Sequence, residues 1–149
     1  MKLLRVGQHG QEKVAAMDSE NKIRDLSSHI VDLNPDTINF KTLEKLQKIK
    51  IETLPEIPNN TRIGPCVNRP SNILCIGLNY SLHAEQTGSK LPDNPIVFNK
   101  SPDCLQGPND PIKKNSSQEK LDYEVELALV IGKEAKNVSE DKALDLSLI

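Results

Sequence analysis

The sequence predicts a mixed α+β fold that is mostly β-structure. Short apolar runs that read as strands recur along the 149 residues, and polar segments rich in turn residues separate them. One stretch repeats apolar residues at helical spacing. No internal repeat or low-complexity segment breaks this pattern. Several short strands joined by long polar loops are typical of a mixed, mostly β domain.

The first third of the chain predicts strands, a hairpin and one helix. Residues 1–7 and 13–27 read as strand and hairpin pieces, and the DSEN tetrapeptide at residues 18–21 has the chemistry of a turn. Apolar residues at 43, 46 and 49 share one helical face, and Asp36 is the expected cap of this helix.

The rest of the chain predicts alternating short elements and turns. The expected elements are a buried strand at 72–80, a short helix and mobile loop at 81–95, a strand at 96–102, a turn at 107–111, a strand at 121–131 and a helix from about residue 139. Residues 53–72 contain four prolines and predict a loop or linker.

Composition and charge narrow the class of protein. Hydrophobic residues make up 36% of the chain, charged residues 27%, and the net charge is -2 without a basic block, so nothing indicates nucleic-acid binding. No apolar run approaches the roughly 20 residues of a membrane span. The N-terminus turns polar too early for a secretory signal, and three cysteines without CxxC spacing favour a reduced, cytoplasmic compartment.

A pair of carboxylates stands in the apolar run at 121–131. Because side chains alternate along a strand, Glu124 and Glu126 would share one face with Ala128 and Val130, their Cα atoms roughly 6.5 to 7 Å apart. Buried carboxylates need a neutralising partner. That partner could be a hard cation such as Mg²⁺ or a Lys or Arg of a neighbouring strand. Alternatively, the face that carries the two glutamates is exposed to solvent and needs no partner.

Two further residues close to expected strands have side chains that could take part in catalysis or substrate binding. His83 follows the strand at 72–80 in a polar loop, where it could act as a general base or order a water, with Glu85 and Gln86 close enough to orient it. Lys100 ends the strand at 96–102 and could meet an anionic group or an enolate. Either residue taken alone is more often an exposed side chain without a catalytic role, and Cys75 is expected to be a core residue.

The order of these segments resembles the fumarylacetoacetate hydrolase superfamily. The resemblance is carried by ILCIGLNYSLHAEQTG, PIVFNKSPDCLQGPNDPI and LDYEVELALVIGK, from residue 72 to about residue 145. The N-terminal stretch and IGPCV are similar to the lead-in domain of a bacterial branch that includes 2,4-diketo-3-deoxy sugar acid hydrolases and proteins labelled ureidoglycolate lyase. The resemblance implies an incomplete family β-roll preceded by a small N-terminal α/β segment.

The resemblance also implies boundaries and partners. The expected divisions are a small N-terminal domain at 1–57, a proline-rich linker at 58–71 and the first part of the catalytic domain at 72–149. It implies Mg²⁺ or Mn²⁺ as cofactor, a 2-oxo acid as small-molecule substrate and a homodimer in the intact family member, with no nucleic acid or membrane.

The family pattern assigns roles to matching residues. Glu124 and Glu126 match the two metal-binding glutamates, and His83 matches the histidine that activates water. The remaining matches are Lys100 for the lysine near the substrate, and Asn79 and Tyr80 for the Asn-Tyr pair before the catalytic loop. The implied chemistry is hydrolysis or lysis of a C–C or related bond in a 2-oxo or 2,4-dioxo acid, such as a diketo-deoxy sugar acid, an acylpyruvate or a fumarylacetoacetate-like compound.

The sequence departs from the family pattern in two places. The position three residues after the histidine, usually Glu, is Gln86, and the glutamate comes one residue early at Glu85. Either Glu85 substitutes through a shifted helical register or the His-Glu dyad is weakened. The family's third metal ligand, an Asp in an NDVS-like segment, has no counterpart before the last residue. The alternatives are therefore an inactive, truncated fragment, or a ureidoglycolate lyase, 2-oxo acid hydratase or oxaloacetate decarboxylase-type relative.

Overall fold

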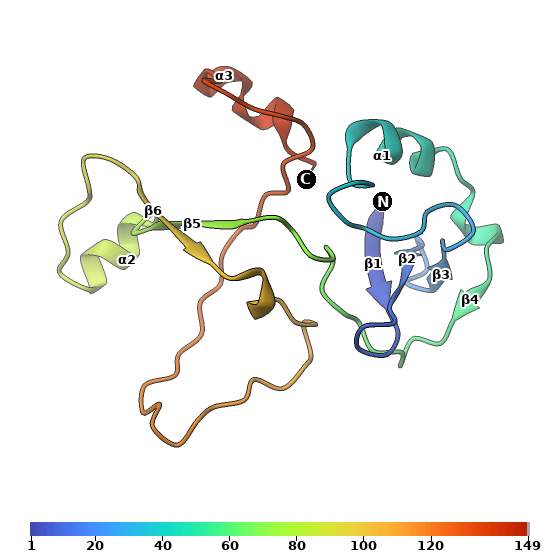
Figure 1. Cartoon of the computed structure of the whole chain (residues 1–149), viewed down its shortest axis with the longest axis horizontal. Coiled ribbons are helices and arrows are strands. Elements are labelled where there is room, and N and C mark those ends of the chain that lie inside the picture. Colours follow the sequence, from blue (N-terminus) through green and yellow to red (C-terminus); the bar gives the residue numbers. More distant parts are fainter. Residues whose placement is uncertain (149) are drawn as a thin grey trace. The chain divides into compact units, whose positions relative to one another are not determined.

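The computed structural model describes residues 1–148 and divides into two compact units. The first unit joins Met1–Asn68 to the chain from Gln106 onward, and the second is Arg69–Leu105 (Figure 1). Within the described residues six strands outnumber three short α-helices, as expected for a mixed, mostly β fold. The division at 1–57, 58–71 and 72–149 stays a prediction.

A four-stranded antiparallel sheet forms the centre of the first unit. Its strands are β1 (Lys2–Val6), β2 (Lys13–Met17), β3 (Ile23–Asp25) and β4 (Glu56–Ile57), in the order β1-β2-β3-β4. The register sets Leu4 opposite Ala15 and Ala15 opposite Asp25. The open edge of β1 is partly covered, because Val6 forms a bridge with Ile63.

The turn between β2 and β3 confirms the predicted hairpin. The Asp18 carboxylate accepts hydrogen bonds from the amides of Glu20 and Lys22, both at 2.9 Å, and Asn21 adopts a left-handed φ of 61°. The other Asp18 oxygen accepts from Arg24 Nε at 2.8 Å. One short acidic side chain therefore closes the turn and anchors the start of β3.

Helix α1 (Phe40–Gln47) forms where the apolar spacing predicts a helix. The predicted cap at Asp36 is wrong, because the Asn39 side chain accepts the hydrogen bond from Thr42 N at 2.9 Å. The Asn34 side chain instead accepts from the amides of Asp36 and Thr37, which makes a separate turn and delays the helix start. A single helical turn, η1 (Ile51–Thr53), follows α1.

Both faces of β2 are covered, so the core of the first unit has two parts. One side of the sheet carries a cluster that reaches from β2 to α1 and consists of Val14, Ala16, Leu26, Ile30, Leu33 and Leu46. The other side carries a smaller cluster of Val6, Ala15 and Ile23. The run of fully buried residues at 14–16 explains why β2 reads as continuously apolar rather than alternating.

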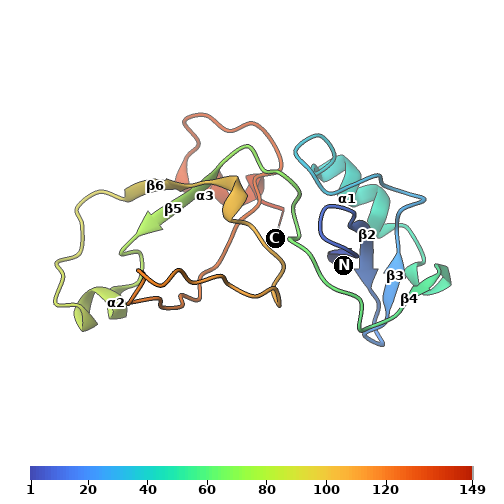
Figure 2. The same cartoon turned by 60° about the horizontal axis from the view of Figure 1, so that its bottom comes forward.

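The second unit is an antiparallel strand pair with one helix in the connection. Strand β5 (Ile73–Gly77) pairs with β6 (Ile96–Lys100), and both views show them side by side (Figures 1 and 2). Helix α2 (Ser81–Gln86) lies between them in sequence, and the short turn η2 (Pro102–Cys104) follows β6. These elements confirm the predicted strands and short helix.

The strand at 72–80 was predicted to be buried, and this part of the prediction is wrong. Leu74 remains 65% exposed and Cys75 is half-buried rather than a core residue. Within residues 69–105 only Ala84 of α2 is a buried hydrophobic residue. A two-stranded sheet exposes its apolar side chains unless a second layer covers it, and the described part of this unit supplies no such layer.

The strand predicted at 121–131 does not form. Residues 117–130 have no regular structure among the described residues, and only Ile131 forms a bridge, to Ser147. Hydrogen bonds of 2.8 Å from Leu148 N to Val130 O and from Gly132 N to Leu146 O support that bridge. A strand requires a neighbour along its length for its backbone groups, and the described chain pairs this segment only at its end.

The C-terminal helix begins where it was predicted. Helix α3 (Glu140–Ala143) starts after Ser139, which occupies the N-cap position without a side-chain cap hydrogen bond, and η3 (Leu144–Leu146) follows. No helix within residues 1–148 is long and apolar enough to cross a membrane.

A chain of ion pairs ties distant segments of the first unit together. Arg5, only 4% exposed, donates from Nε to Asp32 at 2.6 Å and from Nη2 to Glu12 at 3.4 Å. Glu12 also accepts from Arg62 Nη1 at 2.7 Å. We call Arg5, Glu12, Asp32, Arg62 and Asp110 the ionic network.

The network reaches the turn at 107–110 that was predicted from GPNDP. Arg62 holds the Asp110 carboxylate through two parallel hydrogen bonds of 2.8 and 2.6 Å, a bidentate geometry that is among the strongest in proteins. Asp110 also accepts from Gly107 N at 2.8 Å. A Cβ on residue 107 would collide with the carbonyl of Ile63, so glycine is required for this close approach.

Replacing Arg5 should destabilise the first unit strongly. Arg5→Met leaves the Glu12 and Asp32 carboxylates without their buried guanidinium, and removal of one partner of a buried ion pair costs about 3 kcal/mol. Urea unfolding followed by circular dichroism measures the loss. Arg69→Met is the matched control, since Arg69 is exposed and in no ion pair of the described residues. Equal stability of the two variants would contradict a structural role for the network.

The network also predicts a loss of stability in acid. Arg62 lowers the pKa of Asp110, and for Glu12 the hydrogen bond from Arg62 and the charge of Arg5 outweigh burial, so the pKa of Glu12 is lowered too. Carboxylates with lowered folded-state pKa values stabilise the fold above their ordinary pKa of about 4 and lose that contribution as pH falls further.

Thermal unfolding between neutral pH and about pH 3 tests this dependence. We expect the melting temperature to fall below about pH 4, and to fall less steeply in Arg62→Met, which has lost the cause of the lowered pKa values. An identical acid profile for the variant and the parent chain would show that other carboxylates govern acid unfolding.

Candidate functional site

Helix α2 and the residues before it hold most of the predicted catalytic side chains. Leu78 takes a left-handed φ of 51° directly after β5 and turns the chain out of the strand, and Tyr80 is the N-cap of α2. The amides of His83 and Ala84 donate to Tyr80 O at 3.1 and 3.2 Å. The sequence GLNY therefore places Asn79 and Tyr80 at the start of the helix.

The helix presents His83 to solvent and buries its other side. Ala84 is 1% exposed, whereas His83, Glu85 and Gln86 are all exposed. Residues three apart on a helix are neighbours, and residues two apart lie on opposite sides. Gln86, rather than Glu85, is therefore the helical neighbour of His83.

The end of α2 is fixed by hydrogen bonds to the His83 carbonyl. Thr87 donates to His83 O from its amide at 3.1 Å and from its hydroxyl at 2.9 Å, and Gly88 continues the chain with a left-handed φ of 65°. These contacts fix the backbone at His83 and leave its imidazole free of hydrogen bonds to the described residues.

Lys100 lies at the opposite end of the β5–β6 ladder from α2. The register pairs Lys100 with Ile73, the first residue of β5, and pairs Ile96 with Gly77, the last. Five-residue strands span roughly 13 Å between their terminal Cα atoms. The second unit therefore groups Asn79, Tyr80 and His83 and keeps Lys100 apart from them.

Glu124 and Glu126 belong to the first unit and lie in the unpaired segment. Both are exposed, and neither forms an ion pair or hydrogen bond within residues 1–148. The Lys or Arg partner that the sequence left open is thus not supplied by the described chain. Because this segment is not a strand, its backbone does not place the Glu124 and Glu126 carboxylates on one face.

The donors present fit a hard divalent cation only in part. Carboxylate oxygens are the ligands that Mg²⁺ and Mn²⁺ prefer, and Mg²⁺ can bind through one or two of them while keeping water. Within residues 1–148 no group of three or more His, Cys, Asp or Glu side chains lies close enough to hold a metal. Glu124 and Glu126 alone would therefore leave most coordination positions of such a cation to other ligands.

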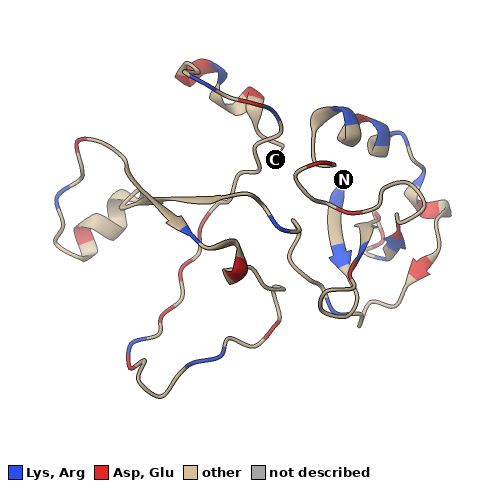
Figure 3. Cartoon of the chain, viewed as in Figure 1, with Lys and Arg blue, Asp and Glu red and all other residues tan. Residues whose placement is uncertain are grey.

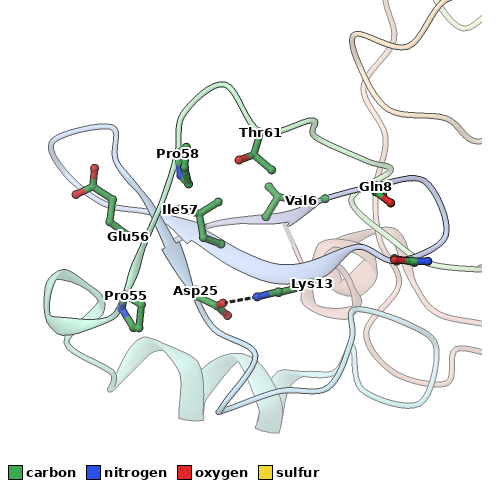
Figure 4. Close-up of a pocket in the computed structure, with 11 residues that line it drawn as sticks. Val6, Gln8, Lys13, Asp25, Pro55, Glu56, Ile57, Pro58 and Thr61 are labelled. Carbon is green, nitrogen blue, oxygen red and sulfur yellow. Dashed lines mark hydrogen bonds and ion pairs between the residues drawn. The ribbon is translucent and has the colours of Figure 1, made fainter.

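A surface pocket of about 450 Å³ opens on the sheet of the first unit (Figure 4). Val6 and Ile57 form part of its wall, and Lys13 Nζ lies 3.1 Å from Asp25 Oδ2 at one side. A smaller, apolar pocket of about 270 Å³ lies beside α1 and is lined by Leu46, Cys66 and Val130 among others. Neither contains a residue predicted to act in catalysis.

The ionic network was missed by reasoning from the sequence. Arg5 and Glu12 flank the β1–β2 turn, but Arg62 lies 50 residues after Glu12 and no local pattern links it to them. The one available signal was Gly107 to Asp110 in a proline-flanked turn, which indicated the turn but not its partner Arg62.

Comparison with known proteins places these residues in a family. A family model described as the C-terminal part of fumarylacetoacetate (FAA) hydrolase matches residues 72–146, which include every predicted site residue. A protein of Burkholderia ambifaria (strain MC40-6) named "Putative hydrolase" is 45% identical over 145 residues, covering 97% of this chain and 51% of its own length. A similarly named protein of Burkholderia lata is 44% identical over the same span.

A solved structure confirms the fold. A fumarylacetoacetate hydrolase from the psychrophilic Exiguobacterium antarcticum matches with a TM-score of 0.71 over 99% of this chain and 52% of its own, at 24% sequence identity. This likeness confirms the expected partial family fold. The chain spans about half the length of the curated relatives it matches. On the match over residues 72–146, the chain belongs to the fumarylacetoacetate hydrolase family.

Proposed function

We propose that the protein cleaves a C–C or related bond in a 2-oxo or 2,4-dioxo acid with the help of a divalent metal. The observation that carries this proposal is the order of His83, Lys100 and the Glu124–Glu126 pair within the family match. Substrates of this class include diketo-deoxy sugar acids, acylpyruvates and fumarylacetoacetate-like compounds. The protein would act in the cytoplasm as a homodimer.

Glu124 and Glu126 are the residues proposed to hold the metal, as Mg²⁺ or Mn²⁺. When bound, such an ion supplies Lewis-acid polarisation of the 2-oxo acid group. Support comes from the donor chemistry and from the exposure of both carboxylates, which leaves their oxygens available.

Residues of the second unit would supply proton transfer, orientation of the reacting groups and substrate binding. His83 accepts a proton from the attacking water, and its solvent-facing position on α2 leaves the imidazole open for this. Gln86, one helical turn away, can orient the imidazole or the water but cannot take a proton. Asn79 and Tyr80 position the start of α2, and Lys100 would bind an anionic group of the substrate.

A second candidate is a non-catalytic role in association with another protein. The exposed apolar segment around Glu124 is the observation that supports it. Lyase, hydratase and decarboxylase chemistry on related acids are variants of the first candidate. A measurement of metal binding distinguishes the metal-dependent enzyme from the non-catalytic role.

Millimolar Mg²⁺ or Mn²⁺ should raise the melting temperature of the chain. Ligand at ten times its dissociation constant adds about 1.4 kcal/mol, which corresponds to a few degrees for a chain of this size. The double variant Glu124→Gln, Glu126→Gln should lose this response. The control Glu44→Gln, Glu52→Gln changes two exposed glutamates elsewhere and should keep it. No shift in the parent chain would favour the non-catalytic candidate.

His83→Ala should lower kcat for hydrolysis of an acylpyruvate by about 10² to 10⁴-fold, the usual contribution of a general base. Loss of the absorbance of the 2,4-dioxo acid measures turnover. Gln86→Glu should raise kcat, since a carboxylate next to His83 stabilises the imidazolium that forms. Glu85→Gln is the matched control, because residue 85 points away from His83 on α2. A larger effect at residue 85 than at residue 86 would show that the helical register differs in the active state.

A further inference from the structure

The chain passes between the two units at two places, and the first of these is fixed at Asn68. The chain leaves the first unit after Asn68 and returns to it at Gln106. The Asn68 side chain donates from Nδ2 to the Asp32 carboxylate at 2.6 Å, and the Asn68 amide donates to the Leu33 carbonyl at 2.6 Å. Both hydrogen bonds lie within the first unit, so they hold the last residue before the chain leaves it.

The return of the chain is fixed in a similar way. The Gly107 amide donates to the Asp110 carboxylate at 2.8 Å, and Arg62 holds that carboxylate through its two parallel hydrogen bonds. Gly107 also lies so close to the Ile63 carbonyl that a Cβ at this position would collide with it. Both connections are therefore anchored where they meet the first unit.

The ionic network joins these two anchors without a break. Asp32, which holds Asn68, accepts from Arg5 Nε at 2.6 Å, and Arg5 Nη2 donates to Glu12 at 3.4 Å. Glu12 accepts from Arg62 Nη1 at 2.7 Å, and Arg62 binds the carboxylate that holds Gly107. The side chains of Arg5 and Glu12 are nearly buried, so water does not compete for their hydrogen bonds. In such a network each bond strengthens its neighbours, and the loss of one weakens the others.

The residue that follows the first anchor has an unfavourable backbone conformation. Arg69 adopts a left-handed φ of 46°, which residues other than glycine rarely take. Arg69 also precedes Pro70, and a residue before proline favours an extended backbone. Such strain persists only where surrounding contacts impose it, and the two hydrogen bonds of Asn68 are contacts of this kind. Arg69 therefore marks the point at which the anchored part of the chain ends.

We propose that the ionic network is one shared anchor for both connections of the second unit, so that release of either connection loosens the other. The second unit, which carries His83 and Lys100, is then attached by one cooperative anchor instead of two independent hinges. Residues of both charges are distributed over the strands and loops of the first unit (Figure 3), so the anchor consists of specific pairs within a mixed surface. This inference needs neither a metal nor a substrate, so it stands apart from the proposed function.

Hydrogen exchange of the whole chain, followed by NMR at single amides, tests the shared anchor. Asn68→Ala removes the side-chain hydrogen bond to Asp32 at the first connection. We expect it to speed exchange of the Gly107 amide, at the second connection, at least about threefold. The reference is the Leu26 amide, which donates to Val14 O at 2.9 Å in the core of the first unit and reports unfolding of the whole unit.

The reverse change and a matched control complete this test. Asp110→Ala should speed exchange of the Asn68 amide by a similar factor, relative to Leu26. Asn59→Ala removes an asparagine side chain that donates to Asn21 O at 3.4 Å, outside the network. It should leave exchange at both connections unchanged.

A variant that interrupts the network tests whether the coupling passes through it. Arg62→Met removes the link between Glu12 and Asp110, so Asn68→Ala added to Arg62→Met should not speed Gly107 exchange further. Glu12→Gln removes the charge that interacts with Arg62 in a milder way and should reduce the effect of Asn68→Ala in the same direction.

Three results would overturn the proposal. An effect of Asn68→Ala that persists in full beside Arg62→Met would show that the coupling runs along the backbone of residues 62–68. Faster exchange only at the connection that carries the substitution would show two independent anchors. Equal acceleration at Gly107 and Leu26 would show that the substitution weakens the whole unit.

Discussion

The ionic network is the interaction on which the first unit depends. The buried guanidinium of Arg5 neutralises Glu12 and Asp32, and Glu12 in turn shares Arg62 with Asp110. None of these charges could be buried alone, because an unpaired buried charge costs several kcal/mol. Through this one network β1, the β1–β2 turn, the loop after β3 and the turn at 107–110 are held together.

The network also determines where the segment that carries Glu124 begins. Arg62 fixes Asp110, and Gly107 lies close to the Ile63 carbonyl, so the turn at 107–110 is held against the segment around Arg62. At the other end, the bridge between Ile131 and Ser147 fixes the exit. The glutamates therefore lie between two fixed points, on the stretch 111–130, which has no strand partner among the described residues. Contacts with other segments fix the two ends of this stretch. Among the described residues, no such contact fixes the part around Glu124 and Glu126.

Local patterns predicted most elements correctly and failed where a distant partner decides the outcome. The β2–β3 turn, α1, α2 and the β5–β6 pair follow from Asp18, apolar spacing and strand runs, all of which are local. The strand at 121–131 has equally strong local propensity, yet it stays unpaired, since a strand also requires a neighbour. A short helix after the strand at 72–80 was expected, but His83 was placed in a polar loop, and the structure places it on α2 instead. The ionic network was not predictable, because no spacing links Arg5 to Glu12, Arg62 and Asp110.

The proposed metal site depends on the alternation of side chains along a strand. If the odd-numbered residues of 121–131 pair with a partner along their edge, the strand becomes regular, and Glu124 and Glu126 then point to one face roughly 7 Å apart. Pairing would thus supply the geometry that the isolated segment lacks for holding a cation. By thermodynamic linkage, a cation held by both glutamates would stabilise the paired strand to the same degree. Metal binding by Glu124 and Glu126 and strand formation in residues 121–131 are therefore expected to strengthen each other.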